Sequence, residues 1–189
     1  LTGMINHGAQ LSIRTYINNV GSIEAVGLFN AGYTMFMTLG SIAFASLDSY
    51  YFPKLSGVFS DLMQRRQTVI RQIKVTVSII VPVALIVIAI LGWLLPLLFS
   101  HEFDSVVPMA QIAIAGLLFR AIYLPMAYMP LSAGDSKTFL CHEFFSALIL
   151  AISVILGYHF YGLTGSGMGL LLSNFIDMTV SFVVAKVKY

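Results

Sequence analysis

The stretch VTVSIIVPVALIVIAILGWLL (75–95) decides the fold class of this chain, because no charged residue interrupts it. An α-helix of about 20 predominantly apolar residues spans the hydrocarbon core of a bilayer. The pattern recurs along the chain, in the stretches 1–17, 26–47, 106–129, 138–157 and 163–185. We therefore expect an all-α integral membrane protein, built as one bundle of six transmembrane helices over residues 1–189.

The composition excludes a water-soluble domain. Hydrophobic residues make up 58% of the chain and charged residues 10%, against about 45–50% and about 25% in soluble proteins. The net charge is only +2, and no basic face is interleaved with aromatic residues, so nucleic acid is not expected as a partner. A single cysteine and the lack of a metal-ligand spacing predict neither a disulfide nor a metal or other cofactor.

The distribution of basic residues predicts how the six spans are oriented. Eight of the ten Lys and Arg residues fall in the connections, and at the C-terminal end, that the six spans place on one side of the membrane: Lys54, Arg65, Arg66, Arg71, Lys74, Lys137, Lys186 and Lys188. The segments of the other side, 18–25, 97–105 and 158–162, contain none. Because positive residues concentrate in cytoplasmic loops, we expect both ends in the cytoplasm. The chain opens inside an apolar run, without Met or a basic n-region, so we expect an excerpt of a longer protein, with no signal peptide.

The connection at 54–74 is the only long one. Apolar residues recur in it at roughly helical spacing, namely Val58, Phe59, Leu62, Met63, Val69, Ile70 and Ile73. With basic residues between them, this pattern is typical of an amphipathic helix on the membrane surface that is attracted to anionic lipid. A solvated basic loop that only determines topology is the other interpretation, and the sequence leaves both open.

Polar residues within the first two spans form stripes, which mark candidate cavity-facing positions. Four polar side chains of the first span lie within about 80° of arc around the helix axis: His7, Gln10, Arg14 and Asn18. Snorkelling to the headgroups is an alternative for Arg14 but does not explain the deeper His7 and Gln10. One face of the second span carries Asn30, Thr34, Met37, Ser41 and Asp48. Asp48 is either an ion-coupling carboxylate or an interfacial group close to Lys54.

The fourth and sixth spans each contain a charged residue on a distinctive face. Arg120 shares its face with the small residues Ala113, Gly116 and Ala127, which let a helix or a ligand approach closely. A guanidinium is always charged and fits phosphate oxygens, so Arg120 is a candidate for binding an anionic headgroup or for an ion pair with Asp48 or Asp177. Asp177 lies beside Ser173, Asn174 and Ser181. It is a candidate for a coupling proton or sodium ion, or for neutralising an Arg.

Two further features are interpreted as structural. The glycine-rich run at 162–169 lacks the lysine and the preceding strand of a phosphate-binding loop, so close helix packing or a helix break is expected. His142 and Glu143 begin the fifth span and match no zinc motif, which favours an interfacial pair. Neither a nucleophile–base pair nor two carboxylates in a shared pocket is apparent, so catalytic residues are not expected and an enzyme is not predicted.

Two motifs resemble a known family. Residues 16–33, YINNVGSIEAVGLFNAGY, are similar to the LG-x-x-x-VG-x-Y-x-x-A linker of polysaccharide transporters. Residues 50–56, YYFPKLS, resemble that family's Y-x-P-x-LS segment, which precedes a basic cytoplasmic loop. With these motifs and its span pattern, the chain resembles the O-antigen and capsule flippase branch of the multidrug/oligosaccharidyl-lipid/polysaccharide exporter superfamily.

This resemblance implies two six-helix bundles around a central cavity, of which the chain is the C-terminal bundle without its N-terminal partner. It implies a protein of the bacterial cytoplasmic membrane that carries undecaprenyl-pyrophosphate-linked oligosaccharide from the inner to the outer leaflet. Alternating access is the expected mechanism, and membrane lipid, a glycan polymerase and a ligase are the further expected partners. Cavity residues vary in the family, so the substrate-binding candidates Arg14, Arg120, His7, Gln10 and Asn30 rest on helix geometry alone.

Other functions remain open on the sequence alone. A cation-coupled multidrug exporter of the same superfamily would use Asp177 and Asp48 to bind cationic drugs, and Arg14 and Arg120 count against it. A membrane-embedded glycan polymerase or acyltransferase would need polar catalytic residues in a loop, for which the outer loops are too short. A purely structural membrane subunit would not need four polar stripes.

Overall fold

The computed structural model describes residues 2–98 and 101–189, and this part of the chain is helical apart from short turns and contains no strand. The predicted all-α class is therefore confirmed. Residue 1 of the first predicted span and residues 99–100 of the 97–105 connection lie outside the described residues. In chain order the elements are α1 (Thr2–Val20), α2 (Ile23–Ser46), the π-helical turn η1 (Leu47–Tyr51), α3 (Phe52–Gly57), α4 (Leu62–Leu98), the 3₁₀ turn η2 (His101–Ser105), α5 (Val106–Ala127), α6 (Met129–Ser132) and α7 (Ser136–Lys188).

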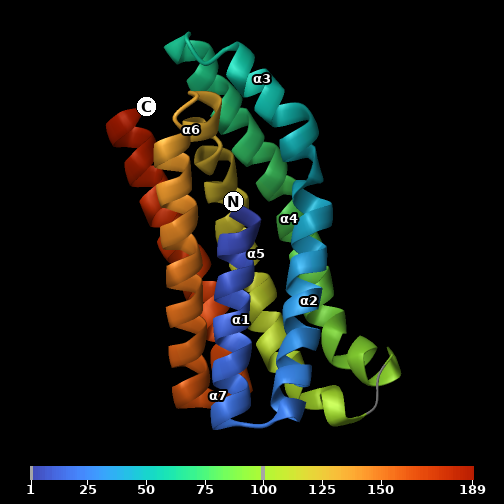
Figure 1. Cartoon of the computed structure of the whole chain (residues 1–189). Helices are drawn as coiled ribbons and strands as arrows, with labels where there is room; N and C mark the ends of the chain where they lie inside the picture. The colour runs from blue at the N-terminus through green and yellow to red at the C-terminus, as the bar shows by residue number, and fades with distance from the viewer. Residues whose placement is uncertain (1, 99–100) are drawn as a thin grey trace.

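The long helices form one bundle with α5 in its interior (Figure 1). α5 packs against α7, α4 and α2, and its small residues Ala110, Ala113 and Gly116 are buried. A Cβ added at Gly116 would lie 3.1 Å from the Cα of Leu171 on α7. Because lipid provides no hydrophobic drive for helix association, such close backbone contact is what holds membrane helices together.

Four helical segments of the described residues are long and apolar enough to cross a membrane: Ile23–Gly57, Leu62–Leu95, Phe103–Ser132 and Ser136–Lys188. The chain is thus a multi-pass membrane protein. α1 is not one of these four segments, whereas Ser136–Lys188 contains two of the predicted spans. The division into six spans therefore stays a prediction.

α7 consists of two antiparallel arms that lie side by side (Figure 1). Its 53 residues would measure about 80 Å as a straight helix, more than twice the roughly 30 Å hydrocarbon core of a bilayer. The chain reverses at Gly162, where φ is 58° and ψ is −142°, a conformation that glycine adopts without a steric penalty. The predicted spans at 138–157 and 163–185 fall on the two arms.

The glycine-rich run after this turn packs helices against one another. A Cβ added at Gly165 would lie 1.9 Å from the carbonyl oxygen of Gly157 on the other arm. A Cβ added at Gly167 would lie 2.4 Å from the carbonyl oxygen of Met109 on α5. No other residue fits at such separations, so close helix packing, one of the two outcomes that the sequence predicted for this run, is found here, next to the break at Gly162.

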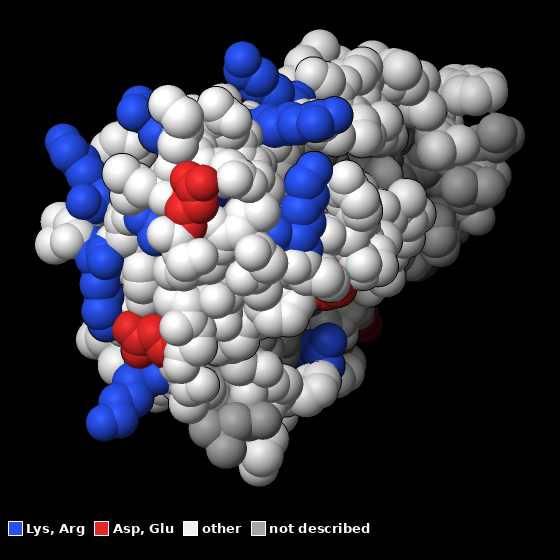
Figure 2. Space-filling view, turned by 90° about the horizontal axis from the view of Figure 1, so that it is seen from above, with Lys and Arg blue, Asp and Glu red and all other residues white. Residues whose placement is uncertain are grey.

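Many Lys and Arg side chains gather at one end of the bundle, where α3, α6 and the end of α7 meet, and few acidic residues accompany them (Figure 2). Residues 62–74, which the sequence left open as a surface helix or a loop, form the first turns of α4. This helix then continues without a break into the predicted third span. Asp61 accepts hydrogen bonds from the backbone N–H groups of Met63 (2.9 Å) and Gln64 (3.0 Å) and so begins the helix.

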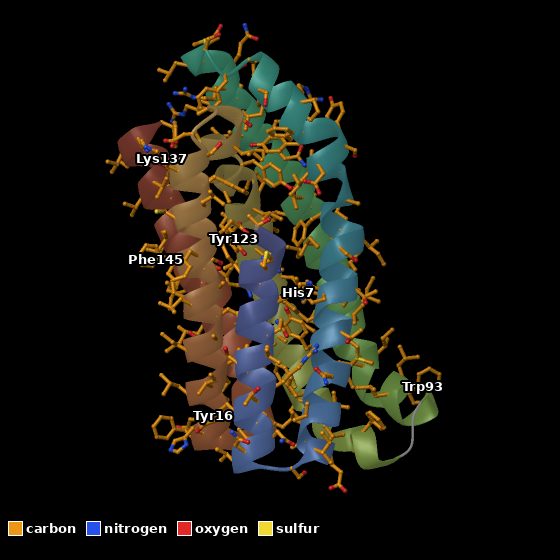
Figure 3. All side chains as sticks on the ribbon, viewed as in Figure 1. His7, Tyr16, Trp93, Tyr123, Lys137 and Phe145 are labelled. Atoms are coloured by element: carbon orange, nitrogen blue, oxygen red, sulfur yellow. The ribbon has the colours of Figure 1, made fainter. Side chains whose placement is uncertain are left out.

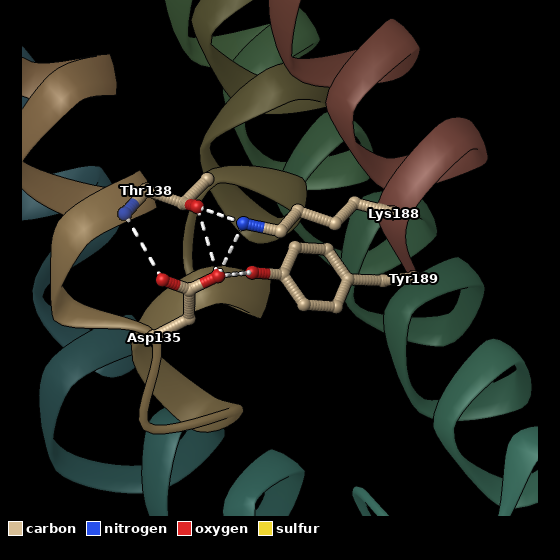
Figure 4. A network of polar contacts seen from close by, with 4 residues as sticks. All are labelled: Asp135, Thr138, Lys188 and Tyr189. Carbon is tan, nitrogen blue, oxygen red and sulfur yellow. Dashed lines mark hydrogen bonds and ion pairs between the residues drawn. The ribbon is translucent and has the colours of Figure 1, made fainter.

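Asp135 joins the two ends of α7 at this basic end (Figure 4). Its carboxylate caps the first arm by accepting a hydrogen bond from the backbone N–H of Thr138 at 3.1 Å. It also pairs with Lys188 at 2.5 Å and accepts a hydrogen bond from the Tyr189 hydroxyl at 2.9 Å. The Lys188 ammonium and the hydrogen bonds from Thr138 and Tyr189 hold the pKa of the Asp135 carboxyl well below its usual range.

Candidate functional site

A cavity of about 190 Å³ lies inside the bundle, between α1, α2, α5 and both arms of α7. Tyr123 is labelled in the interior of the bundle in Figure 3 and forms part of the cavity wall, whereas Phe145 points away from the bundle. The charged residues of the wall are Arg120, Glu143 and Asp177. Ionisable groups inside a membrane protein are costly and mark substrate or ion pathways, so this cavity is the candidate site.

Arg120 on α5 provides the positive charge of the cavity. Its guanidinium carbon lies 5.9 Å from the ring centroid of Phe36 and 5.8 Å from that of Phe44, both on α2. Its Nε is buried and has no hydrogen-bond partner among the described residues. A buried donor without a partner costs about 1–3 kcal/mol, so an anionic ligand would gain from meeting it.

The ion pairs that the sequence left open for Arg120 are not formed. Within the described residues Arg120 makes no salt bridge with Asp48 or Asp177. Two aromatic rings of α2, Phe36 and Phe44, lie near the guanidinium instead, an arrangement that stabilises a cation without neutralising its charge. Arg120 therefore keeps its charge on the wall of the cavity, where it attracts Glu143 and Asp177 without a direct ion pair among the described residues.

Two carboxylates share the cavity because the arms of α7 are antiparallel. Asp177 on the second arm is buried and accepts a hydrogen bond of 2.7 Å from the hydroxyl of Ser146 on the first arm. Glu143, three residues before Ser146, lines the same cavity. The expectation that no two carboxylates share a pocket is thus wrong, because the turn at Gly162 brings together residues that are far apart in sequence.

His142 belongs to this region and is buried, although the sequence favoured an interfacial position. Its Nε2 lies 2.9 Å from the hydroxyl oxygen of Ser181 on the other arm, and its Nδ1 has no partner among the described residues. Which nitrogen carries the proton depends on the tautomer. No group of three or more His, Cys, Asp or Glu side chains within the described part of the chain is arranged to hold a metal ion.

A second cavity of about 300 Å³ lies between α2, η1 and α5. Arg120 lines this cavity as well as the first one, so it stands at the boundary between them. Asp48 lines the second cavity and accepts a hydrogen bond from the hydroxyl of Tyr128. Asp48 lies in the π-helical turn η1, and such widened turns are frequent at functional sites.

The structure brings some of the predicted site residues together and separates others. Gln10, Arg120 and Asp177 line the first cavity, and Asp48 lines the second. His7 and Arg14 are exposed on α1 and line neither cavity. Asn30 on α2 also lines neither, although its Oδ1 is buried without a partner among the described residues.

Sequence reasoning interpreted His142 and Glu143 as an interfacial pair and did not single out Tyr33 and Tyr123, although all four line the cavity. A signal for Glu143 existed, because a carboxylate inside the predicted span 138–157 is as costly as one at Asp177. No signal in the sequence pointed to the tyrosines, since a tyrosine in an apolar run is usually a packing residue or an interfacial anchor.

A family model described as polysaccharide biosynthesis protein matches residues 1–108. No curated protein matches the chain in sequence.

Two solved structures of MATE proteins have a similar fold. One is the crystal structure of a mutant of MATE, with a TM-score of 0.90, 13% identity and coverage of 100% of this chain. The other is the outward-facing conformation of a multidrug resistance MATE family transporter of the MOP superfamily, with a TM-score of 0.87, 13% identity and coverage of 100% of this chain. The chain spans only 43% of the length of each, so its bundle has the fold of a part of such a transporter.

Proposed function

The chain belongs to the polysaccharide biosynthesis protein family, and on this premise we propose that it is the C-terminal bundle of a lipid-linked oligosaccharide flippase. The family and the fold together support a transporter of the multidrug/oligosaccharidyl-lipid/polysaccharide exporter superfamily rather than an enzyme. The proposed substrate is an O-antigen or capsule repeat unit on undecaprenyl pyrophosphate, carried from the inner to the outer leaflet of the bacterial cytoplasmic membrane.

The observation that carries this proposal is Arg120. Its guanidinium is permanently charged, lies between two membrane-embedded cavities and has a buried Nε without a partner among the described residues. Pyrophosphate oxygens accept the charge-assisted hydrogen bonds that a guanidinium donates. We assign Arg120 the role of binding the pyrophosphate during transport.

The remaining polar residues suit the sugar part of the substrate. Gln10 from α1 and Asn174 from α7 line the cavity of Arg120, with Ser173 beside them. Both nitrogen and oxygen of the Gln10 amide are buried without a partner among the described residues. Amides and hydroxyls both donate and accept hydrogen bonds, as sugar hydroxyls require.

The exposed polar residues of α1 fit a bundle that works with a second one. His7 and Arg14 face away from the packed interior, and exposing such residues to lipid would be costly. We propose that they face the cavity between this bundle and its N-terminal partner, where they meet the substrate during alternating access.

A cation-coupled multidrug exporter is the second candidate, and a specific observation favours it. Asp177 and Glu143 line the same cavity as the aromatic residues Tyr33, Phe36 and Tyr123. Carboxylates and aromatic faces are the groups that bind organic cations. In the flippase proposal, a carboxylate of this cavity binds the coupling ion instead, and we assign this role to Asp177.

The two candidates are separated by genetic complementation with the full-length gene. The gene is deleted from its bacterium and restored as wild type, Arg120→Ala or Lys137→Ala. Lys137 is an exposed cation at the basic end that lines neither cavity, so it is the matched control. Cell-associated lipid-pyrophosphate glycan, surface polysaccharide and drug sensitivity are then measured, with the protein level of each variant determined in parallel.

The flippase proposal expects the deletion strain to accumulate inner-leaflet glycan, with rescue by wild type and Lys137→Ala but not by Arg120→Ala. Equal rescue by Arg120→Ala would show that the assigned residue is wrong. Unchanged surface polysaccharide together with increased drug sensitivity would reject the flippase in favour of the exporter.

A further inference from the structure

A groove at the basic end of the bundle lies outside both cavities. We propose that it binds one anionic membrane phospholipid, with the lipid phosphate at Arg66 and Lys186 and the acyl chains along an apolar wall. The groove lies between the start of α4, the region of α5 and α6, and the end of α7, and its volume is about 530 Å³.

The wall of the groove is apolar below a basic rim. Val69, Ile70 and Ile73 of α4 form one side, and Met126 and Phe182 form part of the other. The rim carries Arg65, Arg66 and Lys186, and no acidic side chain of the described residues lines the groove. A ligand that fits must therefore combine a negative charge with long apolar groups.

Two of the three rim cations are free to bind a ligand. Arg66 and Lys186 are exposed and take part in no hydrogen bond or salt bridge with the described residues. Arg65 is held in place instead. It donates a hydrogen bond of 3.2 Å to the carbonyl oxygen of Phe59, and its guanidinium carbon lies 4.7 Å from the centroid of the Phe59 ring. Arg65 thus shapes the rim while Arg66 and Lys186 provide its charge.

The distance between rim and wall matches the architecture of a lipid. Ile73 lies seven residues after Arg66 on the same helix, which corresponds to about 10 Å along the axis. A phosphate at Arg66 would therefore place the first carbons of its acyl chains beside Ile70 and Ile73. Basic residues at the membrane surface are attracted to anionic headgroups, and Figure 2 shows that Lys and Arg surround this end of the molecule.

The lipid headgroup is the source of phosphate that fits both parts of the groove. Free phosphate would satisfy Arg66 and Lys186 but would leave Phe182 and Ile70 without an apolar partner. A neutral phospholipid would cover the wall without attraction to the rim. An anionic phospholipid satisfies both, so we assign the groove to this class.

Lipid binding to the purified full-length protein tests this assignment. Dioleoylphosphatidylglycerol and dioleoylphosphatidylcholine are each titrated into the detergent-solubilised protein, and bound lipid is counted by native mass spectrometry. The variant is Arg66→Gln with Lys186→Gln. The matched control is Lys54→Gln with Lys137→Gln, which removes the same charge from the same end but leaves the groove intact.

The wild type is expected to bind phosphatidylglycerol more tightly than phosphatidylcholine. The groove variant is expected to bind phosphatidylglycerol at least about tenfold more weakly, and the control variant is expected to bind it like wild type. Ile73→Trp, which fills the apolar wall but keeps every charge, is expected to lose the same binding, so the result does not depend on the folding of one variant.

Four outcomes would overturn the assignment. Equal affinity for the two lipids would remove the charge preference, and equal losses in the groove and control variants would indicate attraction to the whole basic end. Displacement of the lipid by millimolar inorganic phosphate would assign the rim to a free anion. Stronger binding of undecaprenyl phosphate, lost in the same groove variant, would assign the groove to the isoprenoid lipid.

Discussion

Arg120 differs from every other basic residue of the chain in its surroundings. Lys and Arg side chains gather at one end of the bundle (Figure 2), whereas Arg120 lies inside it between two cavities. Residue type alone does not distinguish Arg120 from Arg14, since both were predicted within spans. Tertiary packing distinguishes them, because α2 brings Phe36 and Phe44 to the Arg120 guanidinium, whereas Arg14 is exposed.

Asp135 leads to a prediction about pH. Its pKa is lowered in the folded protein by Lys188 and by the hydrogen bonds from Thr138 and Tyr189. Its contribution to stability is therefore complete above the pKa of about 3.9 of an unfolded Asp and is lost as the pH falls through the lower folded pKa. Asp135→Asn, which keeps a good N-cap residue, is expected to lower the unfolding temperature at pH 7.

The control is the same pair of proteins at acidic pH. The difference in unfolding temperature between wild type and Asp135→Asn, measured in detergent, is expected to be largest near neutral pH and smaller at pH 3. A difference that stays constant over this range would contradict the assigned role of the charge.

The close packing of α7 against α5 at Gly167 leads to a second prediction, about stability. Gly167→Ala would place a Cβ 2.4 Å from the carbonyl oxygen of Met109, which forces α7 away from α5. Such overpacking is expected to lower the free energy of unfolding by about 1–3 kcal/mol. Gly57→Ala is the control, because its added Cβ meets nothing within 4 Å. Equal stability of the two variants in a denaturant titration would refute close packing at Gly167.

The positions of most helices were predictable from the sequence, but the points where one helix continues into the next or changes its winding were not. Apolar stretches of about 20 residues predicted most of the helical segments, because a bilayer requires backbone hydrogen bonds to be formed within each span. The merging of the basic segment 62–74 with the third span was not predicted, since its charges suggested a boundary where the helix has none. The π-helical turn at Leu47–Tyr51 had no signal either.

The candidate site was predictable only in part, for a geometric reason. Helical periodicity places residues such as Ser173, Asn174 and Asp177 on one face of one helix. It cannot say which face meets which neighbour, so the partnership of Asp177 with Ser146 and the approach of Glu143 were missed. Both depend on the reversal at Gly162, which the sequence indicated only as a helix break or a packing site.

At the scale of the whole molecule, the orientation of the bundle can be tested by labelling. Cys141 is the only cysteine of the chain, and it is replaced by Ser before single cysteines are introduced by Ser136→Cys and Tyr161→Cys. These positions lie at opposite ends of the first arm of α7. An impermeant maleimide added to intact cells is expected to label the Tyr161→Cys variant and not the Ser136→Cys variant.

The reason is that basic residues gather at the end of the bundle where α7 begins with Ser136 and Lys137, and basic residues stay in the cytoplasm. Labelling of both variants after membrane disruption is the control for reactivity. Labelling of both positions in intact cells would mean that the first arm does not cross the membrane, and labelling of the Ser136→Cys variant alone would reverse the predicted orientation.

Arg120 is proposed to take part in moving a lipid-linked anionic glycan, and this role can be measured as transport in proteoliposomes. The full-length protein is reconstituted as wild type, Arg120→Ala or Lys137→Ala, with a fluorescent undecaprenyl-pyrophosphate oligosaccharide in the membrane, and its appearance in the opposite leaflet is timed. Wild type and Lys137→Ala are expected to transport the glycan lipid, and Arg120→Ala is expected to lose most of this activity. Transport by Arg120→Ala at the wild-type rate would show that Arg120 has no part in moving the glycan lipid.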